Sequence, residues 1–89
     1  MDGNTLLSEL LDLLQDCGVT VRVMPPAADG EHGGGSLVRL RHKEVFFLNE
    51  AAPVAEQVRA LAAALRGRAE LQDRFLPPEL REALDAAEG

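Results

Sequence analysis

The sequence predicts a small α+β domain in which a helix and a strand precede a β-hairpin and two further helices. Three observations predict it. Apolar residues recur at helical spacing near the N-terminus and again after residue 53, whereas valine alternates with other side chains over residues 19–24. Residues 36–48 contain two short apolar runs with a polar turn between them, as in a hairpin. We therefore expect a three-stranded, mainly antiparallel sheet packed by the first two helices, with the third helix at an edge.

The N-terminal helix is predicted over residues 5–17. Its residues at helical spacing are Leu6, Leu7, Leu10, Leu11, Leu13, Leu14 and Cys17. Asn4 or Thr5 suits the N-cap, and Gly18 suits a left-handed stop at the other end. The valines over residues 19–24 then predict a half-buried strand, which the prolines that follow it would end.

A flexible loop and a hairpin are predicted next. Residues 25–35 contain two prolines and four glycines, so we interpret them as a flexible connection within a single domain that spans residues 1–89. The hairpin over residues 36–48 is predicted to turn around His42 and Lys43, although it lacks the Asn-Gly or Asp-Gly pair that hairpin turns favour.

Both strands of the hairpin carry apolar residues on both faces. In the second strand, Val45 and Phe47 share one face. Phe46 and Leu48 share the other. A sheet with one face in water would show a polar alternation instead, so either helices cover both faces or one face binds a partner.

Each of the two later helices is predicted to begin at a proline, which suits the first turn of a helix. The first follows Pro53 and ends at Gly67, and its apolar stripe is Val54, Val58, Leu61, Ala62 and Leu65. The second begins at Pro77 and Pro78.

The last helix has an apolar side formed by Leu80 and Leu84. We expect this side to close the core of the domain, anchored by Phe75 and Leu76 just before the helix. The alternative is a detachable amphipathic helix that binds in a groove of another protein.

The composition excludes several classes of function. Phe46, Phe47 and Phe75 are the aromatic residues other than histidine, and there is neither Trp nor Tyr. Sequence-tolerant binding of single-stranded nucleic acid and aromatic cages for cations both need more exposed rings. The net charge of −6 also disfavours a dedicated binder of phosphate backbones.

We expect a cytoplasmic protein without an association with membranes. Cys17 is the single cysteine, so no disulfide can form within the chain, and a reducing compartment is the simpler interpretation. Asp2 stands where a secretory signal would place positive charge, and no apolar run is long enough to span a bilayer.

One stretch of the chain, EVFFLNEAAPVAEQVRALAAAL, has a strand ending in Leu-Asn, a turn with a proline and then a helix. This order resembles the N-terminal half of the ImmA/IrrE-type zinc metallopeptidase domain, over Leu10 to Gly67. In that family the helix carries a His-Glu-x-x-His motif. The corresponding positions here are Ala63, Ala64 and Gly67, which can neither bind zinc nor move a proton. The resemblance therefore implies the fold without the chemistry.

The sequence offers no catalytic, cofactor-binding or metal-binding constellation, and we expect no cofactor and no small-molecule substrate. His32 lies beside Asp29 and Glu31 in the Gly-rich loop and is interpreted as a solvated loop residue, with a weak surface metal site as the alternative. His42 is interpreted as a turn residue at the tip of the hairpin. The run Gly33 to Gly35 precedes a strand, whereas a phosphate-binding loop follows one, so it is interpreted as a flexible entry to the hairpin. Cys17 is expected to pack as a small apolar residue.

The predicted binding residues lie on the hairpin and are Arg39, Arg41, Lys43, Phe46, Phe47 and Leu48. The three cations are interpreted as a short strip on one face, serving either to balance nearby acids or to bind an acidic partner. We expect a non-catalytic protein–protein interaction or regulatory module, acting on another protein or as a homodimer. The alternatives are a degenerate metallopeptidase-like domain with a residual metal or enzymatic role, and nucleic-acid binding through the basic hairpin.

Overall fold

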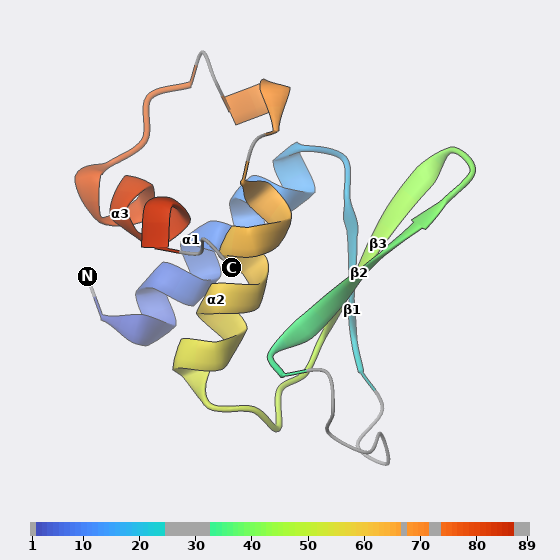
Figure 1. The fold of residues 1–89 in the computed structure, drawn as a ribbon, viewed down its shortest axis with the longest axis horizontal. Helices are drawn as coiled ribbons and strands as arrows, with labels where there is room; N and C mark the ends of the chain where they lie inside the picture. The colour runs from blue at the N-terminus through green and yellow to red at the C-terminus, as the bar shows by residue number, and fades with distance from the viewer. Residues whose placement is uncertain (1, 25–32, 67, 72–73, 87–89) are drawn as a thin grey trace.

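A computed structural model describes residues 2–24, 33–66, 68–71 and 74–86, and it confirms the α+β class (Figure 1). Seven elements follow one another along the chain. They are α1 (Gly3–Asp16), β1 (Thr20–Val23), β2 (Gly35–Leu40), β3 (Lys43–Leu48), α2 (Val54–Leu65), the 3-10 turn η1 (Ala69–Leu71) and α3 (Pro78–Ala86). Among the helices of these ranges, none is long and apolar enough to cross a membrane.

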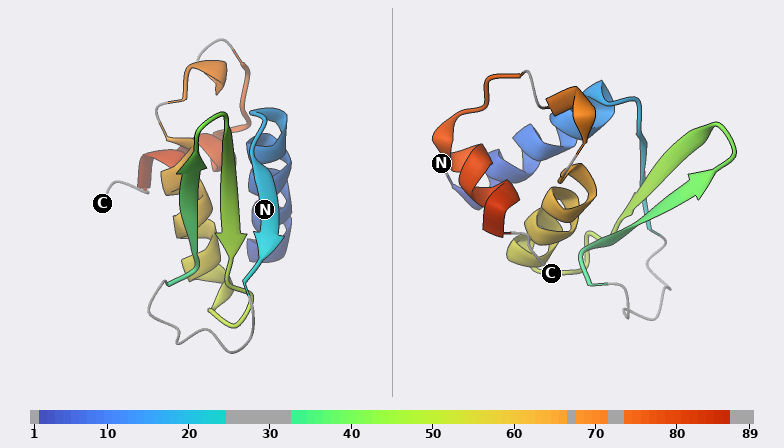
Figure 2. Two further views of the ribbon diagram at one scale, coloured as in Figure 1. Left: turned by 90° about the vertical axis from the view of Figure 1, so that its right-hand side faces the viewer. Right: turned by 45° about the horizontal axis from the view of Figure 1, so that its top comes forward.

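The three strands form one mixed sheet in the order β1-β3-β2. β2 and β3 pair antiparallel over six residue pairs, and β1 pairs parallel to β3 over four, so the sheet is mainly antiparallel as predicted. β3 is therefore the central strand, and β1 and β2 are both edges. The left view of Figure 2 shows the sheet in front with α1 and α2 behind it.

The helices form a layer on one side of the sheet. α1 packs on α2, and these two helices contact β1 and β2 respectively. α3 packs on α2 and α1 on the side away from the sheet (Figure 1), so the prediction that it lies at an edge of the sheet is wrong. Leu80 of α3 is buried in this position, so the outer side of the helical pair supplies α3 with an apolar surface.

α1 begins earlier than the sequence predicts. Asp2, rather than Asn4 or Thr5, is the N-cap, because its carboxylate accepts a hydrogen bond of 2.8 Å from the backbone N–H of Thr5. The other end agrees with the prediction, since Gly18 has a φ of +88° just after the helix.

The hydrophobic core lies between the inner face of the sheet and the helices. Phe46, only 1% exposed, is the largest side chain at its centre. The other buried members are Leu10, Leu13, Leu14, Val19, Leu48, Leu61, Leu65, Leu71, Leu76 and Leu80. Leu76 and Leu80 confirm that the last helix closes the core, but Phe75 is 85% exposed and does not anchor it.

The glycines before β2 have a packing role that the sequence did not reveal. A Cβ on Gly34 would clash with the backbone of Glu56 and Gln57 at the start of α2. The Asn49 side chain donates a 2.8 Å hydrogen bond to the carbonyl of Gly33, and its backbone N–H donates to that of Gly34. β2 begins at Gly35, one residue before the predicted hairpin, so the last residue of the predicted loop belongs to the strand. Residues 25–32 of the predicted loop, including His32, lie outside the described residues, as does Gly67.

Replacing Gly34 by alanine tests this close approach. We expect Gly34→Ala to lower the free energy of unfolding by about 3 kcal/mol, because backbone segments must separate to admit the methyl group. Gly18→Ala is the control, since a Cβ there meets nothing within 4 Å and only the left-handed φ is unfavourable, at about 1 kcal/mol. Urea denaturation measures both. Equal losses in the two variants would contradict the packing role of Gly34.

Candidate functional site

The face of the sheet that points away from the helices is the candidate site. The pairing register defines it, because directly paired residues point to the same side. We call this surface the open face, and its residues are Thr20, Arg22, Ser36, Val38, Leu40, Lys43, Val45 and Phe47. Within the described ranges, no helix lies over it (Figure 2, left).

The middle of the open face is apolar. Val45 and Phe47 lie on the central strand, where Val45 is buried and Phe47 is partly buried. Beside them on β2, Val38 is 37% exposed and Leu40 is 53% exposed. Contiguous exposed aliphatic side chains next to a phenylalanine are a feature of interaction surfaces rather than of an ordinary solvated sheet.

The charged groups of the open face are both cationic. Arg22 on β1 is paired in register with Phe47, and Lys43 at the start of β3 is paired with Leu40. Both side chains are exposed, and no strand residue of the open face is acidic. The surface is thus locally positive on a chain whose net charge is −6.

Glu44 lies on the opposite, helical side of the sheet, where it binds Arg68 and Arg39. Its carboxylate accepts hydrogen bonds of 2.8 and 2.9 Å from the two terminal guanidinium nitrogens of Arg68, and one of 3.0 Å from Nε of Arg39. Nε of Arg68 donates to the carbonyl of Ala64 near the end of α2. This network fastens the end of α2 to the hairpin.

The network also changes the ionisation of Glu44. The hydrogen bonds from the Arg68 side chain lower the pKa of Glu44 from 4.5 to about 2. They outweigh the opposing effect of partial desolvation, and the hydrogen bond from Arg39 lowers the pKa further. The same contact raises the pKa of Arg68. Glu44 is therefore a structural carboxylate rather than a proton donor.

The predicted cationic strip is not a strip on one face. Arg39 points to the helical side and is paired with Glu44, Arg41 lies in the two-residue turn, and Lys43 points to the open face. The strand ends at Leu40, so the alternation that the prediction assumed does not extend through the turn. His42 is a turn residue, as predicted.

Of the three apolar residues predicted to bind a partner, only Phe47 lies on the open face. Phe46 and Leu48 are core residues, because the helices pack on their side of β3, and they cannot reach a partner in this fold. The prediction of site residues missed Arg22, which lies on the open face only because β1 pairs with β3. The alternation along β2 already places Val38 and Leu40 together on the face opposite to Arg39, so the sequence could have indicated that these two residues share a face.

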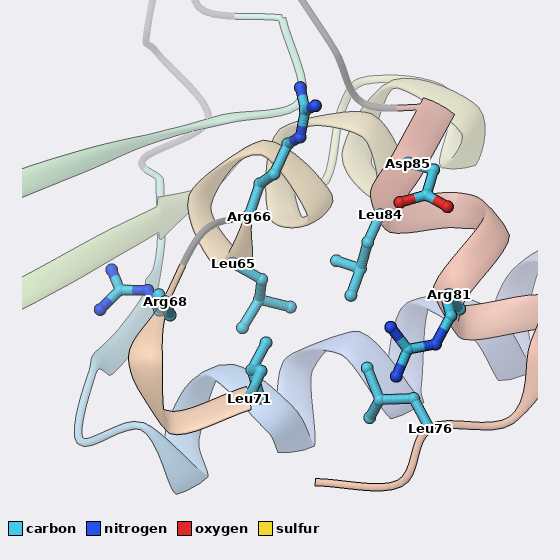
Figure 3. A pocket seen from close by; sticks show the side chains of 8 residues that line it. All are labelled: Leu65, Arg66, Arg68, Leu71, Leu76, Arg81, Leu84 and Asp85. Carbon is cyan, nitrogen blue, oxygen red and sulfur yellow. The ribbon is translucent and has the colours of Figure 1, made fainter. Parts of the chain in front are cut away.

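A hollow of about 270 Å³ lies between the end of α2, η1 and α3 (Figure 3). Leu65, Leu71, Leu76 and Leu84 project into it, whereas Arg66 and Arg68 point away. Among the described residues that line it, Asp85 is the only carboxylate and none is histidine or cysteine. These residues offer no pair of a nucleophile and a base.

The described residues also bring together no group of three His, Cys, Asp or Glu side chains that could hold a metal ion. Ala63 and Ala64, at which the resemblance to the metallopeptidase domain would place motif residues, lie on α2, the first exposed and the second half-buried. Cys17 is half-buried against the core, where burial raises the pKa of its thiol. A thiol in this environment is a poor nucleophile.

Comparison with known proteins gives no relative to draw on: no family model matches the chain, and neither the curated proteins nor the solved structures include a significant match.

Glu44→Gln tests the network at the end of α2. We expect the free energy of unfolding at pH 7 to fall by about 1 to 3 kcal/mol, because the charge-assisted hydrogen bonds from Arg68 weaken. The pKa of Glu44 is lower in the folded chain than in the unfolded one. The stability that its carboxylate contributes to the fold is therefore complete above pH 4.5 and is lost as the pH falls toward 2. The difference between wild type and variant should therefore shrink over that range.

The control is Glu56→Gln, whose carboxylate makes one long contact of 3.8 Å with Arg59. It should cost less than about 0.5 kcal/mol, as for an exposed ion pair. Denaturation curves between pH 7 and pH 2 measure both variants, and a difference for Glu44→Gln that does not depend on pH would contradict the role of its charge.

Proposed function

We propose that this chain is a non-catalytic module that binds another protein through the open face of its sheet. The observation that carries the proposal is the one-sided covering of the sheet. α1 and α2 bury Phe46 and Leu48, while Val38, Leu40 and Phe47 remain on the opposite side without a described helix over them. A partner that covers these side chains would remove apolar area from water.

The pattern of the central strand supports this proposal. β3 reads KEVFFL, with a run of four apolar residues that alternates between the two faces. Central strands with this composition are usually covered on both sides. The described part of the chain supplies one cover, so the second is the part that we assign to a partner.

We also propose that the chain has no catalytic activity. This proposal is supported by alanine at the positions where the metallopeptidase family carries its motif, and by the engagement of Glu44 with Arg68 and Arg39. We also place the protein in the cytoplasm, where a chain with a single cysteine keeps its thiol reduced.

Substitution of Leu40 tests the proposal. We expect Leu40→Glu to reduce the recovery of bound protein at least about tenfold in affinity capture from the source cell, since a buried unpaired charge at an interface costs more than about 1.4 kcal/mol. The bound proteins are identified and quantified by mass spectrometry.

Val23→Glu is a closely matched control. Val23 also lies on an edge strand and is 56% exposed, against 53% for Leu40, but its register with Leu48 places it on the helical side. The Val23→Glu variant should retain the partners that Leu40→Glu loses. Thermal unfolding followed by circular dichroism checks that both variants fold. Equal recovery with the two variants would contradict the open face as the binding surface.

A further inference from the structure

The open face has the size and charge to receive one particular kind of segment. We infer, on the basis of the proposed function, that its occupant is an amphipathic α-helix of a partner protein whose apolar stripe is flanked by carboxylates. Three features of the face lead to this inference: its width, its apolar centre and the placement of its two cations.

The width of the face matches one helix. Neighbouring strands lie about 4.8 Å apart, so three strands span about 10 Å between the outer two, which is close to the diameter of a helix. β3 has six residues and is about 20 Å long. A helix of about 13 residues, or nearly four turns, would cover that length.

The apolar centre fits the stripe of such a helix. Phe47 is partly exposed on the central strand, and Val38 and Leu40 form an exposed ridge beside it on β2. Apolar anchors at positions i, i+3 or i+4 and i+7 of a helix recur at intervals that can contact this ridge along its length. Cover of this kind would give the sheet helices on both faces.

The two cations define the charge of the occupant. Arg22 lies at the β1 edge beside Phe47, and Lys43 lies at the far end of β3, four residues from Phe47 and so about 14 Å away along the strand. Because no strand residue of this face is acidic, carboxylates beside the apolar stripe of a helix, one on its β1 side and one at the end that lies over Lys43, would find cations without an acidic partner among the described residues of the face. Such complementarity contributes chiefly to specificity and to the rate of association.

The same charges disfavour two other occupants. A second copy packed face to face would bring Arg22 and Lys43 of both copies into one interface without an acidic strand residue of either open face, and like charges at an interface are unfavourable. Nucleic acid would meet two cations around an apolar centre, whereas phosphate-backbone binding relies on many clustered Lys and Arg side chains.

The experiment uses two synthetic helical peptides of 14 residues with the same leucine stripe, one with glutamate and one with lysine on the flanks. Each is titrated into the ¹⁵N-labelled full chain, and amide shifts and fluorescence anisotropy are measured at low and high NaCl. We expect the glutamate peptide to bind at least about tenfold more tightly than the lysine peptide, to shift amides of the three strands and to weaken with salt.

Charge reversal provides the variants. Lys43→Glu should lower the affinity for the glutamate peptide and raise the affinity for the lysine peptide. Arg59→Glu, which changes an exposed arginine of α2 on the helical side, should leave both affinities unchanged. Thermal unfolding checks that each variant is folded.

Several results would overturn the inference. These are equal affinity for the two peptides, no binding of either, shifts confined to the helices, a dimer in sedimentation that Leu40→Glu dissociates, or an oligonucleotide that competes for the face. If affinity capture still depends on Leu40 but the peptides do not bind as expected, the proposed function stands and only the chemistry assigned to the partner is wrong. If capture does not depend on Leu40, the proposed function itself fails.

Discussion

The one-sided burial of the central strand is the constraint on which the rest of this structure depends. β3 pairs with both other strands and places Phe46 and Leu48 against α1 and α2. Of the described helices, α1 and α2 cover one face of the sheet. α3 packs on the side of these two helices that points away from the sheet. Val45 and Phe47 are left on the other face by the same alternation.

The Glu44 network links this packing to the charge of the candidate site. By accepting hydrogen bonds from Arg68 and Arg39 on the helical side, Glu44 joins the end of α2 to the hairpin and balances the cations there. Lys43, its neighbour in the chain, points the other way because side chains alternate along a strand. The positive character of the open face thus follows from where the carboxylate of Glu44 lies.

The segment before β2 supports the sheet from its other end. Gly34 packs against the first turn of α2, and Asn49 binds the carbonyl of Gly33 just after β3 ends. The ends of the hairpin are therefore fixed to α2 both at Arg68 and at Gly34. A face held at both ends in this way presents its side chains in a defined geometry, which lowers the entropy lost on binding.

The sequence by itself determined the features that depend on neighbours in the chain. The α+β order, the strands, the stop at Gly18 and the proline start of α3 all follow from local periodicity and backbone preference. It also showed that β3 is apolar on both faces. It could not show which face is buried, because Val45 with Phe47 and Phe46 with Leu48 are equivalent until helices pack on one side.

Only the tertiary structure decided the composition of the site. The parallel pairing of β1 brings Arg22 beside Phe47, the turn separates Arg39 from Lys43, and the packing of α2 gives Gly34 its role. Each of these depends on contacts between residues far apart in the chain. Local patterns fix which side chains share a face of an element, whereas the choice of face is made by the long-range packing that buries it.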